Sequence, residues 1–190
     1  MRILVQRYSA LGDLLILLPL LGSLGKQFPS AEIMLVSRSM VKDLALAEGL
    51  QFKAADLKGK HKGLAGLRRL AREIEHDFKP EIIIDAHYVL RSRVVNLYFK
   101  LRGRPVFHLE KDRAARKAFL AGHPREKSLK PVVQLHAENF QRAGFEGFTL
   151  PTTARFAREA EPAVKSWTNE VLATKNLGLA PLARHFTKTF

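Results

Sequence analysis

The chain has 190 residues, of which 46% are hydrophobic and 26% are charged, so it can bury at least one substantial core. It contains no cysteine, which excludes a disulfide framework and a thiolate metal site and favours a reducing compartment, the cytoplasm. The formal net charge of +14 predicts attraction to phosphate-bearing partners. Such partners include nucleic acid, anionic lipid and lipid-linked sugars, and charge alone does not choose among them.

An apolar run at 14–21 raises the question of a signal peptide or a membrane span. Arg7, Gly12 and Asp13 interrupt the stretch around it, and neither apolar segment reaches the roughly 20 residues that span a bilayer. The run is therefore expected to lie in a folded core, and any contact with a membrane is expected to be peripheral.

Strands and helices are predicted to alternate along most of the chain, because short apolar runs are separated by segments with apolar residues at helical spacing. In chain order the expected elements are a strand at 2–7, a helix at 13–28, a strand at 32–36, a helix at 40–47, a weak strand at 52–54, an amphipathic basic helix at 63–78, a strand at 81–86, a helix at 89–101, a strand at 105–109 and a helix at 132–143. This alternation is typical of right-handed βαβ units. We therefore expect an α/β protein with a Rossmann-like parallel sheet.

The pattern divides the chain into three parts. Residues 1–150 are expected to form one Rossmann-like domain, in which 110–130 is a charged stretch that forms a short helix or a loop. Residues 151–175 are predicted to be a linker and a connecting helix. Residues 176–190 begin a second βα unit and do not complete it, so we expect the chain to be a fragment of a longer protein.

Ligands of doubly wound sheets bind beyond the carboxyl ends of the strands, so the loops that follow Arg7, Asp85 and His108 should line one crevice. The first of these loops has one glycine, whereas a dinucleotide-binding turn needs three, and it lacks the Gly-Lys-Ser/Thr of a P-loop. The sequence also shows no His, Asp and Glu cluster with metal-ligand spacing and no Gly-x-Ser-x-Gly elbow. These common enzyme classes are therefore disfavoured.

The first loop nevertheless contains residues suited to chemistry, namely Ser9, Gly12 and Asp13. We expect Gly12 to allow a sharp turn or the close approach of a ligand. Asp13 lies at the start of the expected helix, where the helix dipole favours its ionised form. A helix-capping or first-turn acid explains Asp13 equally well without any catalytic role.

Four stretches of this sequence occur in the order found in one enzyme family. They are RILVQRYSALGDLLILLPLLGSLGKQFPSAEI at 2–33, IIIDAHYVLRS at 82–92, HAENFQRAGF at 136–145 and LGLAPLARHFTKTF at 177–190. Together they resemble the family 9 glycosyltransferases, the ADP-heptose:lipopolysaccharide heptosyltransferases. The first stretch carries the most specific match, which is a short strand, a Ser-x-x-Gly-Asp turn, an apolar helix and a Pro-x-Ala-Glu-Ile strand opening.

This resemblance implies the GT-B arrangement, in which two Rossmann-like domains face each other across a cleft. The first domain would bind the acceptor and the second most of the nucleotide sugar. The chain would then hold the N-terminal domain and an incomplete start of the donor-binding domain, and this fragment would be inactive alone. The implied reaction is the inverting transfer of a heptose or a similar sugar to the lipopolysaccharide inner core.

The resemblance also implies roles for particular residues. Asp13 corresponds to the catalytic base that takes the proton of the acceptor hydroxyl, and Thr187 and Lys188 correspond to the loop that binds the donor phosphates. Lys188 is equally consistent with a solvated lysine near a chain end. The implied donor is a nucleotide sugar, most simply ADP-heptose, and neither a further cofactor nor a metal ion is implied.

The implied acceptor is a lipid A-linked core on the cytoplasmic side of the inner membrane of a Gram-negative bacterium, with the protein held peripherally on the anionic membrane surface. His87 and Tyr88 follow the strand-end Asp-Ala where many family members have Gln-Gly, and both would line the crevice, which bears on the identity of the acceptor. His136 is open to a capping or a buried role as well, and the basic residues are equally consistent with a solvated face. The residues expected to bind the acceptor are Ser9, Gly12, Lys58, Lys60, Lys62, His87, Arg91, Arg116 and His136, with Arg68 on the same basic surface.

The alternative interpretation is a basic α/β module that binds RNA or DNA through phosphate contacts. Its aromatic residues, including Tyr8, Tyr88, Tyr98 and Trp167, are scattered and form no stacking motif. We therefore expect no nucleic-acid partner. The sequence makes no prediction about the oligomeric state.

Overall fold

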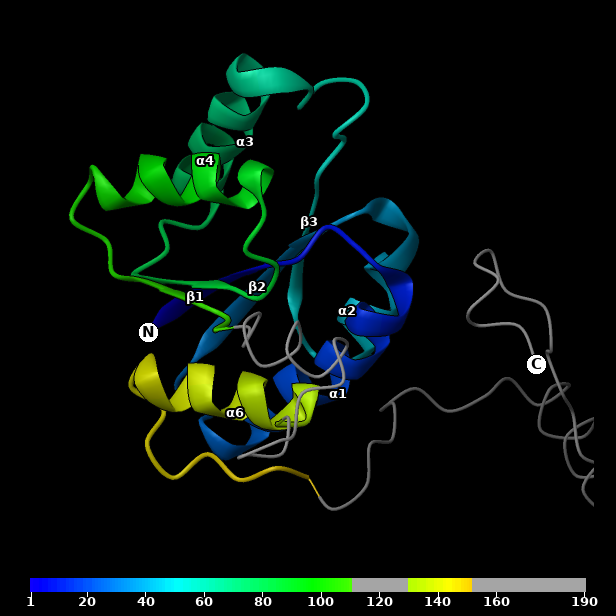
Figure 1. The fold of residues 1–190 in the computed structure, drawn as a ribbon, viewed down its shortest axis with the longest axis vertical. Helices are drawn as coiled ribbons and strands as arrows, with labels where there is room; N and C mark the ends of the chain where they lie inside the picture. The colour runs from blue at the N-terminus through cyan, green and yellow to red at the C-terminus, as the bar shows by residue number, and fades with distance from the viewer. Residues whose placement is uncertain (111–129, 152–190) are drawn as a thin grey trace, which may run out of the picture. The chain divides into compact units, whose positions relative to one another are not determined.

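The computed structural model describes residues 1–110 and 130–151, which contain a parallel five-stranded sheet (Figure 1). The strands stand in the order β3-β2-β1-β4-β5, and each neighbouring pair is parallel. Their bounds are β1 Arg2–Gln6, β2 Glu32–Ser37, β3 Gln51–Ala54, β4 Ile82–Asp85 and β5 Val106–His108. The helices are α1 Leu11–Gln27, α2 Lys42–Ala47, α3 Gly63–Asp77, α4 Leu90–Lys100 and α6 Val132–Arg142, with a 3-10 turn at Ser39–Val41.

Helices cover both faces of the sheet and make two apolar cores. Figure 1 shows α3 and α4 on one face and α1, α2 and α6 on the other. The alternation of side chains along β1 divides them between the cores, because Ile3 and Val5 pack toward α1 whereas Leu4 packs toward α3. All three side chains have no exposed surface. A strand that is apolar on both faces is what a sheet covered on both sides requires.

The predicted fold class is confirmed, and the predicted elements are found nearly where they were expected. The weak strand at 52–54 is the edge strand β3, which pairs only with β2 among the described residues. The first helix starts earlier than predicted, at Leu11, so that Asp13 lies inside its first turn. Its N-cap residue is Ala10, which has no side chain able to cap the helix.

Several sequence predictions fall outside the described residues. They are the charged stretch at 111–129, most of the linker at 151–175, the incomplete domain at 176–190, and the site residues Arg116, Thr187 and Lys188. These remain predictions. Among the helices that the structure describes, none is both long and apolar enough to cross a membrane.

Candidate functional site

The strand order reverses direction at the centre of the sheet, between β1 and β4. From β1 the chain proceeds outward to β2 and β3, and it then returns to the other side to form β4 and β5. In folds of this kind the ligand crevice lies at this switch point, beside the loops that leave β1 and β4 at the carboxyl edge of the sheet. Two contacts join these loops directly. The Arg7 guanidinium donates a hydrogen bond to the carbonyl of Ala86, and the backbone N–H of Tyr8 lies 3.4 Å from Nδ1 of His87.

Asp13 faces this crevice from the first turn of α1 and forms an ion pair with Arg7. The Arg7 side chain is only 5% exposed, whereas that of Asp13 is 43% exposed. A buried guanidinium thus holds a carboxylate at the surface of the crevice. Sequence analysis missed this role of Arg7. The sequence did contain a signal for this role, because Arg7 comes immediately after β1 and six positions before Asp13.

Ser9 and His87 meet beside this ion pair, although they are 78 positions apart in the sequence. The Ser9 hydroxyl lies 3.3 Å from Nε2 of His87. Because Nδ1 of His87 faces the N–H of Tyr8, the ring fits best as the tautomer that carries its proton on Nε2 and donates it to Ser9. The structure therefore brings Ser9, Asp13 and His87 together, as the sequence predicted.

Asp85 organises the loop that carries His87. Its Oδ1 accepts hydrogen bonds from the backbone N–H groups of His87 and Tyr88, at 2.9 and 2.7 Å. Its Oδ2 accepts a bond of 2.7 Å from the Asn96 side chain in α4. Asp85 is fully buried, so these donors are what makes its carboxylate tolerable at that position. Asp85 thus fixes this loop from inside the fold, although its own side chain does not reach the crevice.

The Asp85 contacts continue as a buried chain of side-chain hydrogen bonds under the crevice. Gln6 donates to the Oδ1 of Asn96 and accepts a bond of 2.7 Å from the Tyr8 hydroxyl. Burial, and secondarily the charge of Asp85, raise the pKa of Tyr8, so its hydroxyl stays protonated and keeps this donor role. Sequence analysis did not find this network, because its members are separated by up to 90 positions.

Tyr88 links the crevice to the third loop. Its backbone has φ of +49°, a left-handed conformation uncommon for a residue with a side chain, and the Asp85 carboxylate bond holds it there. The Tyr88 ring stacks on His108 at the end of β5, with ring centroids 4.0 Å apart. The loops after β1, β4 and β5 are therefore contiguous, as predicted.

The structure corrects the expectation for Gly12. The residue lies within α1, so the sharp turn predicted there is wrong. A Cβ atom at this position would meet no atom within 4 Å, so local packing does not require glycine. The close approach of a ligand remains a prediction.

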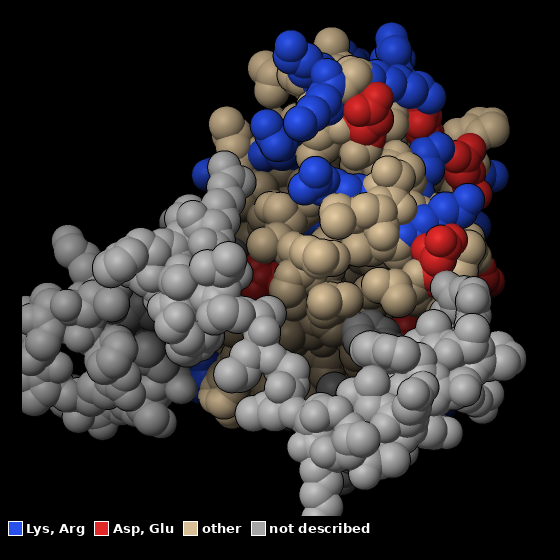
Figure 2. All heavy atoms as spheres, turned by 90° about the vertical axis from the view of Figure 1, so that its right-hand side faces the viewer, with Lys and Arg blue, Asp and Glu red and all other residues tan. Residues whose placement is uncertain are grey.

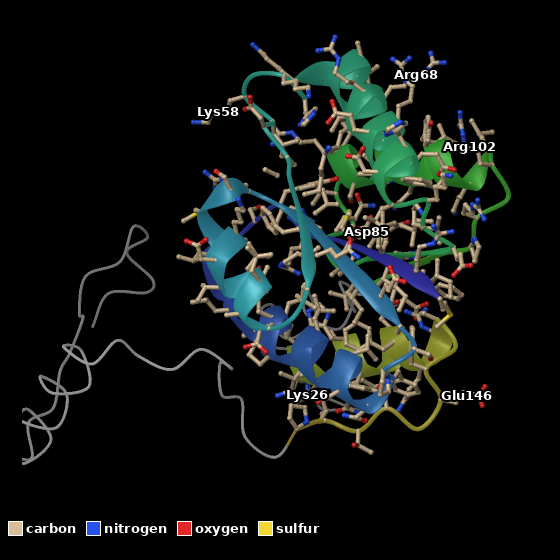
Figure 3. All side chains as sticks on the ribbon, turned by 180° about the vertical axis from the view of Figure 1, so that it is seen from behind. Lys26, Lys58, Arg68, Asp85, Arg102 and Glu146 are labelled. Carbon is tan, nitrogen blue, oxygen red and sulfur yellow. The ribbon has the colours of Figure 1, made fainter. Side chains whose placement is uncertain are left out.

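The other described residues expected to bind acceptor are not joined to this cluster by any described contact. Arg91 is exposed at the start of α4. His136 is fully buried on α6, 6.4 Å from the Phe140 ring centroid, so a ligand would need a rearrangement to reach it. Lys58 and Lys62 are exposed on the loop between β3 and α3, and Figure 3 shows Lys58 at the same end of the described residues as Arg68.

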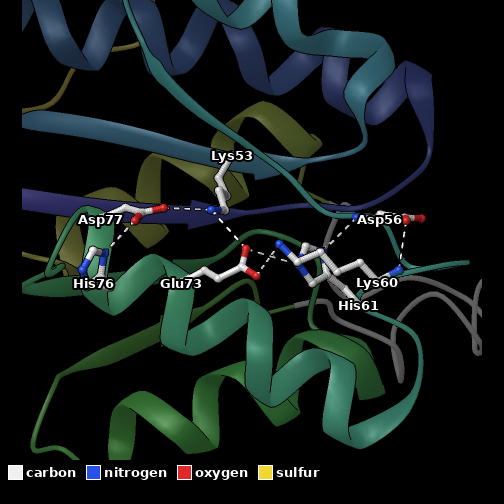
Figure 4. A network of polar contacts seen from close by, with 7 residues as sticks. All are labelled: Lys53, Asp56, Lys60, His61, Glu73, His76 and Asp77. Atoms are coloured by element: carbon white, nitrogen blue, oxygen red, sulfur yellow. Dashed lines mark hydrogen bonds and ion pairs between the residues drawn. The ribbon is translucent and has the colours of Figure 1, made fainter.

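Lys60 lies in the same loop but is part of a local ion-pair network (Figure 4). Its Nζ lies 2.7 Å from Glu73 in α3, and Lys53 contacts the same carboxylate at 3.1 Å. Partial burial acts to raise the pKa of Glu73, but the hydrogen bonds and charges of Lys60 and Lys53 outweigh it and lower the pKa to about 2. The carboxylate therefore anchors the basic loop to α3.

This network predicts a loss of stability in acid. A carboxylate with a folded-state pKa below its unfolded value stabilises the fold above about pH 4.5, and this contribution is lost as the pH falls toward 2. Glu73→Gln should therefore lower the unfolding free energy at neutral pH and flatten its decline between about pH 5 and pH 2. Denaturant unfolding at a series of pH values measures both effects. The control is Glu146→Gln, at an exposed carboxylate; an unchanged slope for Glu73→Gln would contradict the account.

Ser9 and His87 are half-buried, and Asp13 is half-exposed. Two hollows on the described residues lie elsewhere, one of about 380 Å³ beside Arg142 on α6 and one of about 490 Å³ between α1 and α2. Neither is lined by Ser9, Asp13 or His87. The residues that the structure describes also contain no group of three or more His, Cys, Asp or Glu side chains able to hold a metal ion.

Comparison with known proteins bears on the fold. No family model matches the chain, and no curated protein matches its sequence. Among solved structures, the family 9 glycosyl transferase from Veillonella parvula DSM 2008 matches with a TM-score of 0.53 and 20% identity, over 93% of this chain and 50% of its own. The E. coli heptosyltransferase WaaC with ADP matches with a TM-score of 0.54 and 16% identity, over 80% of this chain and 50% of its own.

The same E. coli enzyme with ADP-2-deoxy-2-fluoro heptose gives a TM-score of 0.55 at 17% identity, again over 50% of its length. This chain thus spans about half the length of each of these glycosyltransferases. At such identities the similarity is one of fold. The fold of this chain corresponds to that of half of a family 9 glycosyltransferase. This confirms, at the level of the fold, the resemblance predicted from the sequence motifs.

Proposed function

We propose that this chain is the acceptor-binding half of an inverting glycosyltransferase that moves a heptose, or a similar sugar, from a nucleoside diphosphate to a lipid A-linked core. The observation that carries the proposal is the cluster of Asp13, Arg7, Ser9 and His87 at the point where the strand order of a Rossmann-like sheet reverses. This is where such folds bind ligands, and the solved relatives of the same fold transfer sugars.

Asp13 is the proposed general base. An acceptor hydroxyl in the crevice would lose its proton to the carboxylate as its oxygen bonds to the anomeric carbon of the donor, while the bond from that carbon to the diphosphate breaks. Attack from the face opposite the leaving group inverts the configuration. The half-exposed position of Asp13 on the first turn of α1 allows an acceptor hydroxyl to reach its carboxylate.

Arg7 is the proposed positioning residue for Asp13. Because its guanidinium is buried and also bonded to the Ala86 carbonyl, it fixes one oxygen of the carboxylate and leaves the side chain one preferred orientation. His87 and Ser9 would supply further hydrogen bonds to an acceptor hydroxyl on the same edge. Their donor and acceptor atoms suit a polyhydroxylated ligand better than an apolar one.

The coverage of only half of the solved relatives supports an arrangement in which another domain supplies the donor site. The solved E. coli relative was determined with ADP, and this chain spans half of that protein. We assign the donor, an ADP-sugar, to a second domain, with Thr187 and Lys188 at its beginning. Lys58, Lys62 and Arg91 would attract the phosphates of the acceptor, and the protein would act at the cytoplasmic face of a Gram-negative inner membrane.

The 190-residue chain alone is expected to bind acceptor and to transfer no sugar. Binding of de-O-acylated lipid A that carries inner-core sugars can be followed by calorimetry, and transfer by incorporation of radiolabelled heptose from ADP-heptose. Binding of acceptor without transfer is the expected result, because this chain spans half of its solved relatives and we assign the donor to a second domain. Robust transfer by this chain would contradict the two-domain account. Equal affinity for a generic oligonucleotide would instead favour a nucleic-acid module.

A further inference from the structure

The outer face of α4 exposes a row of leucines. Leu90, Leu97 and Leu101 are 74%, 56% and 77% exposed, and Leu101 directly follows the last residue of the helix. Their spacing of seven and four residues places them along one side of the helix. Single exposed leucines are ordinary, but an aligned row is a feature of surfaces that meet an apolar partner.

The fold itself does not need this row. The inner face of α4 is formed by Ser92, Val95, Asn96 and Phe99, all of which are buried. Phe99 and Val95 pack in the core shared with α3, and Asn96 bonds to Asp85. The leucines lie on the opposite side of the helix, so polar residues there would fold equally well.

Positive charge surrounds the leucine row. The helix carries Arg91, Arg93 and Lys100 and has no acidic residue, and Arg102 follows it. The Arg102 guanidinium lies 3.7 Å above the Tyr98 ring, which holds its charge close to the helix. Figure 3 shows Arg102 and Arg68 at the same end of the described residues, and Figure 2 shows many Lys and Arg side chains, with some Asp and Glu among them, at that end.

We propose that this outer face of α4, defined by Leu90, Leu97, Leu101, Lys100 and Arg102, docks on an anionic lipid bilayer. Leucine side chains flanked by arginine and lysine suit the boundary between headgroups and acyl chains, where apolar area and opposite charge both contribute to binding. Nucleic acid would match the charges but leave the leucines in water. A bilayer with anionic headgroups satisfies both features.

This inference goes beyond sugar transfer, because it requires neither a donor nor an acceptor sugar. It places the membrane contact on α4 and not on the basic loop, whose Lys58, Lys60 and Lys62 were expected to bind the acceptor. Lys60 in that loop is already paired with Glu73. If the proposed function holds as well, docking through α4 would bring the chain to a lipid-linked acceptor.

The test is co-sedimentation of the 190-residue chain with vesicles. Vesicles of phosphatidylcholine with about 30% phosphatidylglycerol should bind the wild type, whereas pure phosphatidylcholine should bind it weakly. Reversing two charges in Lys100→Glu with Arg102→Glu should lower the partition coefficient at least about tenfold, and raised salt should shrink the difference. Leu97→Gln with Leu101→Gln should lower it at least about tenfold even at high salt, because lost apolar burial is not screened.

Two matched controls keep the result specific. Lys26→Glu with Lys42→Glu makes the same change in net charge at two exposed lysines of α1 and α2, and Met40→Gln with Leu46→Gln removes two other exposed apolar side chains. Both controls should bind nearly as the wild type does. Circular dichroism establishes that all variants are folded. Loss of binding in the Lys26 and Lys42 reversal equal to that in the α4 reversal, or equal binding to neutral vesicles, would overturn the proposal. Neither result would touch sugar transfer, which is assayed without vesicles on a soluble acceptor.

Discussion

Replacing Asp13 by Asn is expected to lower sugar-transfer turnover by about 100- to 10,000-fold, the usual contribution of a general base. Asparagine keeps the shape of the side chain and one oxygen for the Arg7 guanidinium, but it cannot take a proton at neutral pH. Because this chain spans half of its solved relatives, the assay uses the chain joined to a donor-binding half. Turnover is measured as heptose incorporated from ADP-heptose at saturating acceptor.

The control is Asp43→Asn, at another acid in the first turn of a helix, α2, and it should leave turnover unchanged. Acceptor affinity of Asp13→Asn should also stay within about threefold of the wild type, since a base acts in the transition state more than in the bound ground state. Near wild-type turnover for Asp13→Asn would remove Asp13 as the base. The role of Asp13 would then be only that of an acid in the first turn of α1.

Replacing Asp85 by Ala is expected to destabilise the fold by about 3 kcal/mol, because one buried and two partly buried donors lose their acceptor, at roughly 1 to 3 kcal/mol for a buried donor. The donors are the N–H groups of His87 and Tyr88 and the side chain of Asn96. In thermal unfolding this corresponds to a fall in Tm on the order of 10 °C. Asp43→Ala, at an exposed position, should change stability by less than about 0.5 kcal/mol.

Asp85→Asn removes the negative charge of this side chain but keeps its shape. Its remaining oxygen can still accept from the two backbone N–H groups, but its new amide faces the amide of Asn96. Relief requires Asn96 to turn over, which then places its amide against that of Gln6. The variant should therefore be intermediate in stability. A Tm for Asp85→Ala within about 2 °C of the wild type would show that the network does not fix the loop.

The sequence predicted the parallel sheet because its signals are local. The apolar runs of β1 and β4 and the helical spacing of α3 depend only on neighbouring residues, and all three elements form as expected. Asp13, Ser9 and His87 were also predictable, because the rule that ligands lie at the carboxyl ends of strands converts chain order into position. That rule does not require any knowledge of side-chain contacts.

What the sequence did not predict depends on contacts between distant residues. Arg7 follows an apolar strand, and only the position of α1 shows that its buried guanidinium meets Asp13. Asp85 was predicted only as the strand end before a crevice loop, and the inward bond of its side chain to Asn96 depends on the position of α4. The expected turn at Gly12 failed for a local reason, since the helix starts one residue before it and the backbone there is helical.

Binding of acceptor by the isolated chain, resolved residue by residue, tests the central claim most directly. Amide chemical shifts of the ¹⁵N-labelled 190-residue chain are recorded during titration with de-O-acylated lipid A that carries inner-core sugars. The account predicts saturable shifts at Ser9, Asp13, His87 and Tyr88, around the crevice at the carboxyl edge of β1 and β4. Saturable shifts confined to other surfaces, or the absence of binding at millimolar acceptor, would contradict the assignment of this crevice as the acceptor site.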